Sequence, residues 1–286
     1  NIYSITIKLS VTSIGDGAFP GCTSLEQLRI EESENTLKLG HHTYNYGGTG
    51  KGLFYDCPLQ YVFIGRDLNY MYNNSYANSP SYYGYSPFTY NSTLQKVTFG
   101  KGVRVISKYI VASCPNFTTM EFEGCEPTGI EPYAFNNCTA LTENDVKYPE
   151  TVTYIGEGAF WGCRGLEGYT IPSNITTVNV NAFKNCENLA NLIIKPGVTT
   201  IADGAFTGCK GLQTVTFSPN DIHLGTGVFY NCTGIKTINF TGNKVDAGTC
   251  GAVANTAAAL IRMRSGNAYV YDNYFKGTSQ EKSFCN

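Results

Sequence analysis

The chain has 286 residues, of which 42% are hydrophobic and 15% are charged, a composition typical of a folded protein. Its formal net charge of -2 produces no global field that would attract nucleic acid or an anionic membrane. No apolar run approaches the ~20 residues that a membrane-spanning helix needs. These numbers argue against a nucleic-acid-binding protein and against a transmembrane segment in this chain.

A Phe-x-x-Cys motif returns every 23 residues in the second half of the chain, as FWGC, FKNC, FTGC and FYNC. A fixed period in the twenties predicts a stack of small units rather than one globular core. Earlier copies of the motif follow longer or less regular intervals, and one of them carries Asn91 in place of the cysteine. The cysteines at this position are Cys22, Cys57, Cys114, Cys138, Cys163, Cys186, Cys209 and Cys232.

Each repeat is predicted to contain a short strand, a second extended segment and a turn. The first strand covers Ile2–Ile7 and recurs along the chain as L-x-x-V-x-F, whose alternation suits a strand with one buried face. The second segment, as in Val198–Phe206, is expected to end in one or two helical turns that carry Ala-Phe. About ten parallel strands result, and we assign residues 1–240 to this repeat solenoid.

Two repeats are stretched, because the first two intervals between marker positions are 35 and 34 residues. The inserts lie near residues 41–52 and 69–85, are rich in Tyr, Asn, Gly and Ser, and are expected to leave the stack as loops. We see no acidic partner near His41 and His42 and predict no metal site there. His223 is expected to face solvent.

The repeat fades after Phe240, and residues 241–286 are predicted to form a C-terminal cap with a short helix at Ala257–Met263 and a strand at Ala268–Tyr271. Cys250 and Cys285 lie in this cap and could form a disulfide that closes it; two unpaired thiols are the alternative. The repeat cysteines are instead predicted to be buried free thiols that act as small hydrophobes. No C-x₂-C pair supports a zinc site.

Strand alternation also predicts which side chains face outward from the sheet. The outward pairs are Ser4/Thr6, Gln27/Arg29, Tyr61/Phe63, Lys96/Thr98, Thr119/Glu121, Glu143/Asp145, Gly168/Thr170, Asn191/Ile193, Thr214/Thr216 and Thr237/Asn239. The C-terminal pairs are small and mostly neutral. The candidate partner-binding residues are therefore Tyr61, Phe63, Lys96, Glu121, Glu143 and Asp145, with Tyr82 and Tyr83 from the second insert. The alternative is that the inserts simply cover Tyr61 and Phe63.

The segments VTSIGDGAFPGC (Val11–Cys22), VTYIGEGAFWGC (Val152–Cys163) and VTTIADGAFTGC (Val198–Cys209) resemble the BspA-like leucine-rich repeats of bacterial cell-surface proteins. The resemblance covers roughly residues 2–240, with departures at Asn91, Val111 and Asn144. It implies a right-handed, gently curved solenoid with a parallel inner sheet. It also implies a secreted or surface-anchored protein that mediates adhesion, and it transfers no catalytic residue.

We therefore expect a non-enzymatic, monomeric binding module without a cofactor. Its partner would be a protein or a glycan on host tissue, matrix or other cells. We place it outside the cell, with any signal or anchor region outside this chain. The competing interpretation is a passive structural spacer in a larger surface protein. A buried polar cluster inside a deep pocket would instead favour an enzyme.

Overall fold

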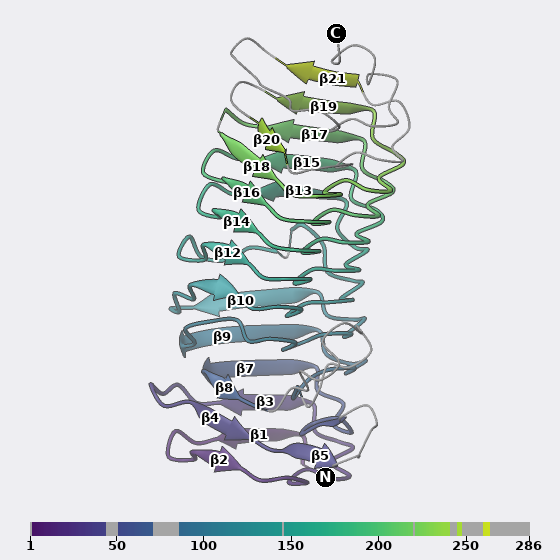
Figure 1. Cartoon of the computed structure of the whole chain (residues 1–286). Coiled ribbons are helices and arrows are strands. Elements are labelled where there is room, and N and C mark those ends of the chain that lie inside the picture. The colour runs from purple at the N-terminus through teal and green to yellow at the C-terminus, as the bar shows by residue number, and fades with distance from the viewer. Residues whose placement is uncertain are drawn as a thin grey trace. The chain divides into compact units, whose positions relative to one another are not determined.

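The structure is a computed structural model that describes residues 2–43, 51–70, 86–144, 146–219, 221–240, 245–247 and 260–263. The chain divides into two compact units, Asn1–Pro149 and Glu150–Asn286. In each unit successive repeats add one strand to a parallel sheet, and a shorter second sheet runs alongside (Figure 1). The predicted leucine-rich-repeat solenoid is thereby confirmed.

In the first unit, the inner sheet has the order β1-β3-β7-β9-β10, all parallel. Its strands are β1 (Ser4–Ile7), β3 (Gln27–Ile30), β7 (Tyr61–Arg66), β9 (Lys96–Gly102) and β10 (Thr119–Glu123). The second sheet contains β2 (Ser13–Ile14), β4 (Leu37–Leu39) and β8 (Leu68–Asn69). The short β11 (Gly129–Ile130) contributes an isolated parallel bridge between Ile106 and Ile130.

In the second unit, the inner sheet has the order β13-β15-β17-β19-β21. Its strands are β13 (Gly168–Ile171), β15 (Asn191–Ile194), β17 (Thr214–Phe217), β19 (Thr237–Phe240) and β21 (Leu260–Met263). The second sheet contains β12 (Tyr154–Ile155), β14 (Thr177–Val178), β16 (Thr200–Ile201), β18 (Ile222–Leu224) and β20 (Val245–Ala247). Both sheets are parallel, so each repeat repeats the path of the one before it.

The core is built from ladders of apolar residues at equivalent positions of successive repeats. Strand registers pair Leu192 with Val215 and Ile194 with Phe217, and all four side chains are buried. Phe183 stacks on Phe206 with ring centroids 5.2 Å apart, close to the ~4.8 Å spacing of neighbouring strands. A single repeat cannot bury its apolar side, so these ladders exist only because the repeats stack.

Hydrogen-bonded turns occupy the places where we predicted helical turns, and no described residue lies in a helix. The N–H groups of Ala205 and Cys209 donate to the carbonyls three residues earlier, Ala202 and Phe206. Between them, Gly204 and Gly208 have φ of 62° and 75°, a left-handed conformation that interrupts any helix. The sequence GAF therefore marks a sharp turn, with Gly or Asn at most of the equivalent left-handed positions.

The repeat cysteines are free thiols, as predicted, and they form a ladder of their own. The Cys209 thiol donates to the carbonyl of Phe183 in the previous repeat over 3.2 Å, and Cys232 donates to Phe206 over 3.0 Å. Asn91 replaces this contact with a bond from its amide to the carbonyl of Cys57 at 2.8 Å. Cys125, off the ladder, is also a buried free thiol, as predicted.

Two local predictions were wrong. Glu143 lies in a turn rather than on a strand, and the described residues 141–144 contribute no strand to a sheet. Asn144, exposed where the repeat requires a buried apolar residue, accounts for the interruption. Residues 260–263 form β21 instead of part of a helix. The predicted strand at 268–271 and the cysteines Cys250 and Cys285 lie outside the described residues, so the boundary at residue 240 stays a prediction.

The first insert begins and ends in a short antiparallel pair, β5 (His41–Thr43) with β6 (Lys51–Gly52). The second follows β8, where buried Tyr70 donates its hydroxyl to the carbonyl of Lys108 over 2.6 Å. Both inserts therefore follow a strand of the second sheet, β4 or β8, and neither starts at the inner sheet.

Candidate binding groove on the inner sheet of the first unit

The outward face of the inner sheet in the first unit is hollowed into a groove of about 430 Å³. We call it the inner-face groove; it runs over β1, β3, β7 and β9 to the end of β10. The residues that line it include Thr6, Arg29, Tyr61, Phe63, Lys96 and Glu123. The volume lies within the usual range of small-ligand sites.

Aromatic side chains occupy the middle of this groove. Tyr61 is 45% exposed, and most residues of the two inserts lie outside the described ranges, so their predicted cover of this ring stays a prediction. Phe63 is half-buried because the Arg29 guanidinium lies 3.9 Å from its ring centroid, a cation–π contact. Gly100 lies against Phe63, where a Cβ atom would meet Phe63 Cζ at 2.5 Å. A larger residue at position 100 would displace the ring.

The predicted charged residues of β9 and β10 contact each other. Lys96 Nζ lies 2.6 Å from Glu121 Oε2, and the Thr98 hydroxyl donates to the same carboxylate over 3.4 Å. Thr98 faces outward as predicted but is buried by this arrangement. Lys96 and Glu121 neutralise one another, so the unbalanced charge at this end of the groove comes from the exposed Glu123.

The structure brings together four of the predicted site residues, Tyr61, Phe63, Lys96 and Glu121, on adjacent strands. It does not bring Glu143 to them, because that residue lies in a turn. The other three, Asp145, Tyr82 and Tyr83, lie outside the described residues. Sequence reasoning missed the roles of Arg29 and Gly100, although the register that pairs Arg29 with Phe63 follows from aligning the repeats.

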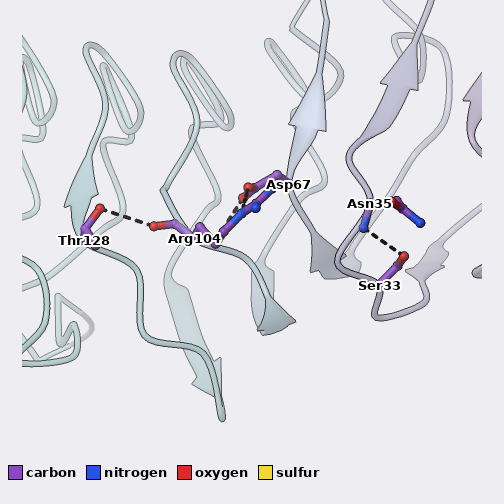
Figure 2. Close-up of polar contacts among 5 residues, drawn as sticks. All are labelled: Ser33, Asn35, Asp67, Arg104 and Thr128. Carbon is purple, nitrogen blue, oxygen red and sulfur yellow. Dashed lines mark hydrogen bonds and ion pairs between the residues drawn. The ribbon is translucent and has the colours of Figure 1, made fainter.

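A network of polar contacts holds the corner at the end of the inner strands (Figure 2). Arg104 Nε lies 2.7 Å from Asp67 Oδ2, and the Thr128 hydroxyl donates to the Arg104 carbonyl over 3.5 Å. In the neighbouring corner of the same figure, the Asn35 N–H donates to the Ser33 hydroxyl over 3.1 Å. The Asp67–Arg104 and Arg104–Thr128 contacts tie consecutive loops together, and the Asn35–Ser33 bond closes a turn within one loop.

Fully buried Arg66 strengthens the same corner. Its guanidinium donates to the carbonyls of Lys8 and Leu9 over 2.9 and 3.2 Å, so it links the end of β7 to the loop that follows β1. Burial lowers the pKa of Arg66, while Glu31 opposes that shift. The contact spans the intervening repeat and so restrains β1 and β7, two of the strands that carry the groove.

Both adjacent histidines have acidic neighbours, contrary to our expectation. His41 Nδ1 lies 2.7 Å from Asp16 Oδ1, and His42 Nε2 lies 2.8 Å from Asp56 Oδ2. Alignment of the repeats could have found the first pair, because Asp16 lies one repeat before His41, 25 residues earlier, the same offset that pairs Ile14 with Leu39. Each histidine contacts a different carboxylate, and within the described residues no group of three or more His, Cys, Asp or Glu could hold a metal ion. His223 is exposed, as predicted.

The family model for the BspA type leucine-rich repeat region matches residues 1–84, 81–190 and 153–282. The chain belongs to this family. The resemblance stated from the sequence is thereby confirmed. BspA-type repeats are found in surface-protein and protein-interaction modules and are generally non-enzymatic. The search of curated proteins returned no match.

Several solved structures are similar to this chain. A leucine-rich repeat protein from Bacteroides ovatus is 18% identical with a TM-score of 0.49, and the match covers 91% of this chain and 63% of that one. A leucine-rich repeat protein from T. pallidum is 21% identical over 73% of this chain and 83% of that chain, with a TM-score of 0.48. A leucine rich cell surface protein from Faecalibacterium prausnitzii is 20% identical over 86% and 78%, with a TM-score of 0.40.

The chain thus spans less than two thirds of the length of the Bacteroides ovatus protein. Across the described ranges of the chain, no helix has the length and apolarity needed to cross a bilayer.

Proposed function

We propose that this chain is a non-enzymatic binding module of a bacterial cell surface and that the inner-face groove contacts its partner, a protein or a glycan. The observation that carries the proposal is the exposed Tyr61 ring beside the Arg29–Phe63 pair, on a sheet held by paired strands and the corner network. Rigid aromatic side chains provide a large contact area at a low entropic cost. Family membership supports a surface or interaction role.

The second unit provides a natural comparison for the same face. On β13, β15, β17 and β19 the outward residues are small or neutral, such as Thr214 and Thr216, and Ile193 is 40% exposed. A spacer would be expected to have such a plain face throughout. The contrast between the two inner sheets therefore favours a binding role for the first unit over the spacer interpretation.

The test is to probe glycan and protein arrays with the soluble chain and with two matched variants. We expect Tyr61→Ser to weaken binding to the captured partner by at least tenfold, because it removes an exposed aromatic anchor. Ile193→Ser, an exposed apolar residue of the other unit, should leave binding unchanged. Equal binding by a folded Tyr61→Ser variant would contradict the proposal.

A further inference from the structure

Arg29 differs from the two lysines near the groove because, within the described residues, it forms no ion pair with a carboxylate. Lys8 lies 2.9 Å from Glu31, and Lys96 lies 2.6 Å from Glu121. Among the residues that the structure describes, Arg29 contacts the Phe63 ring, and its exposed guanidinium donates no hydrogen bond to any acceptor. It is therefore a cation that presents its donors to the groove.

Neighbouring acids do not neutralise this guanidinium by direct contact. Glu31 accepts hydrogen bonds from Lys8 Nζ at 2.9 Å and from the Leu9 N–H at 2.8 Å. Lys8 lowers the pKa of Glu31 most, and Arg29 contributes the smallest part of the shift. Glu123 lies three strands away on β10, about 14 Å at the usual strand spacing. That separation exceeds the ~8 Å screening length at physiological salt.

The contact with Phe63 prepares Arg29 for a planar anion. Contact with the ring 3.9 Å away restrains the guanidinium, whose planar fork of N–H donors matches the two oxygens of a carboxylate. The pairing of β3 with β7 places Arg29 beside Phe63, and Gly100 leaves room for the ring. Arg29 is therefore already restrained before an anion binds, and binding costs little further side-chain entropy.

The rest of the groove indicates what carries the carboxylate. The hydroxyls of Ser4 and Thr6 and the side-chain amide of Gln27 line the same end, and none of these side-chain groups donates to a described residue. Tyr61 adds an exposed ring on the next strand. An aromatic face beside hydroxyl and amide groups suits the C–H face and the hydroxyls of a sugar. Every inner strand from β3 to β9 is paired on both sides, so an extended peptide finds no free backbone edge there.

Resting on the proposed function, we infer that the groove binds an acidic glycan, with Arg29 receiving the carboxylate of a uronic or sialic acid. Tyr61 then packs on the sugar ring, and the Ser4–Thr6–Gln27 end contacts its hydroxyls. Glu123, at the opposite end, disfavours a second carboxylate and so fixes the direction in which the glycan lies.

The experiment uses a glycan array printed in matched pairs that differ only in the carboxylate: uronic-acid glycans with their reduced neutral forms, and sialylated glycans with their desialylated forms. We expect wild-type chain to bind carboxylated members and Arg29→Gln to bind them roughly ten- to a hundredfold more weakly, the range for a lost charge-assisted hydrogen bond. Arg29→Lys should recover only part of the loss. Higher salt should weaken wild-type binding.

The control is Arg164→Gln, because Arg164 is an exposed arginine of the second unit that pairs with Glu187 at 3.1 Å. It should bind like wild type, and thermal melts should show that all variants fold. Equal binding of neutral and carboxylated glycans, no bound carboxylated glycan, or an unchanged Arg29→Gln would overturn the inference. Capture of an acidic peptide instead, lost in Arg29→Gln, would overturn the glycan assignment.

The two proposals fail separately. If Tyr61→Ser abolishes binding of a neutral glycan or a protein while Arg29→Gln does not, the groove still binds the partner and the carboxylate subsite is wrong. If neither variant changes binding of any captured ligand, both proposals are wrong.

Discussion

A buried thiol that donates to the preceding repeat explains why cysteine recurs at one position. Its small volume fits between stacked turns, and its S–H satisfies a carbonyl that already accepts one backbone bond: Phe183 receives both the Cys186 N–H and the Cys209 thiol. Serine could donate the same bond, but it buries a more polar group. The ladder is therefore a packing device, and its function is to hold the sheet that carries the groove.

Because these thiols are buried, the free energy of unfolding is expected to decrease at alkaline pH. Burial raises the pKa of Cys114 to about 12 and raises the pKa of Cys209 well above its usual range. An unfolded thiol titrates near ~8.5. The folded state thus holds its protons longer, so the stabilisation is complete below that pH and is lost as pH rises toward the folded values. We expect the free energy of unfolding to fall steeply above about pH 9.

Urea unfolding at several pH values measures this effect, with Cys209→Ser as the comparison because the hydroxyl does not titrate in this range and can still donate to Phe183. Its stability curve should be shallower above pH 9 by as much as about 1.4 kcal/mol per pH unit, the value for one proton. Parallel curves for the two proteins would show that Cys209 does not keep its proton on folding.

At the scale of the turn, glycine is required where the backbone is left-handed. Gly208 has φ of 75°, and a Cβ atom there would overlap the Asn185 amide oxygen. We expect Gly208→Ala to destabilise the chain by about 1–2 kcal/mol, the cost of the left-handed conformation for an L-residue. Gly15→Ala is the matched control, since its Cβ would meet nothing within 4 Å. Equal thermal melts for both variants would contradict this account.

The same turns show what sequence reasoning could and could not establish. The 23-residue period and the strand alternation predicted the register, because a one-residue slip would turn every buried side chain outward. They could not distinguish a helical turn from successive left-handed turns, since GAF suits both. Nor could they predict that Phe63 is half-buried under Arg29, because that depends on side-chain conformations across two strands. Asn144 did signal the interruption that removed Glu143 from the predicted face.

At the scale of the whole molecule, a stack of repeats distributes stability as a sum of local terms and neighbour contacts. Phe206 is fully buried between Phe183 and Phe229, with ring centroids 5.2 and 5.7 Å away. We expect Phe206→Ala to cost about 3–5 kcal/mol, the usual range for removing a buried phenylalanine. Because its partners are the adjacent repeats, the loss should be confined to part of the second unit.

Native-state hydrogen exchange of Phe206→Ala resolves where that loss falls. Amides of β15, β17 and β19 should exchange faster, while those of β1, β3 and β7 should keep most of their protection, because local opening follows local contacts. Binding through the inner-face groove of the first unit should then persist at temperatures where the second unit already opens. A uniform loss of protection across both units would instead show that the chain unfolds as one cooperative body, and that the groove depends on the entire stack.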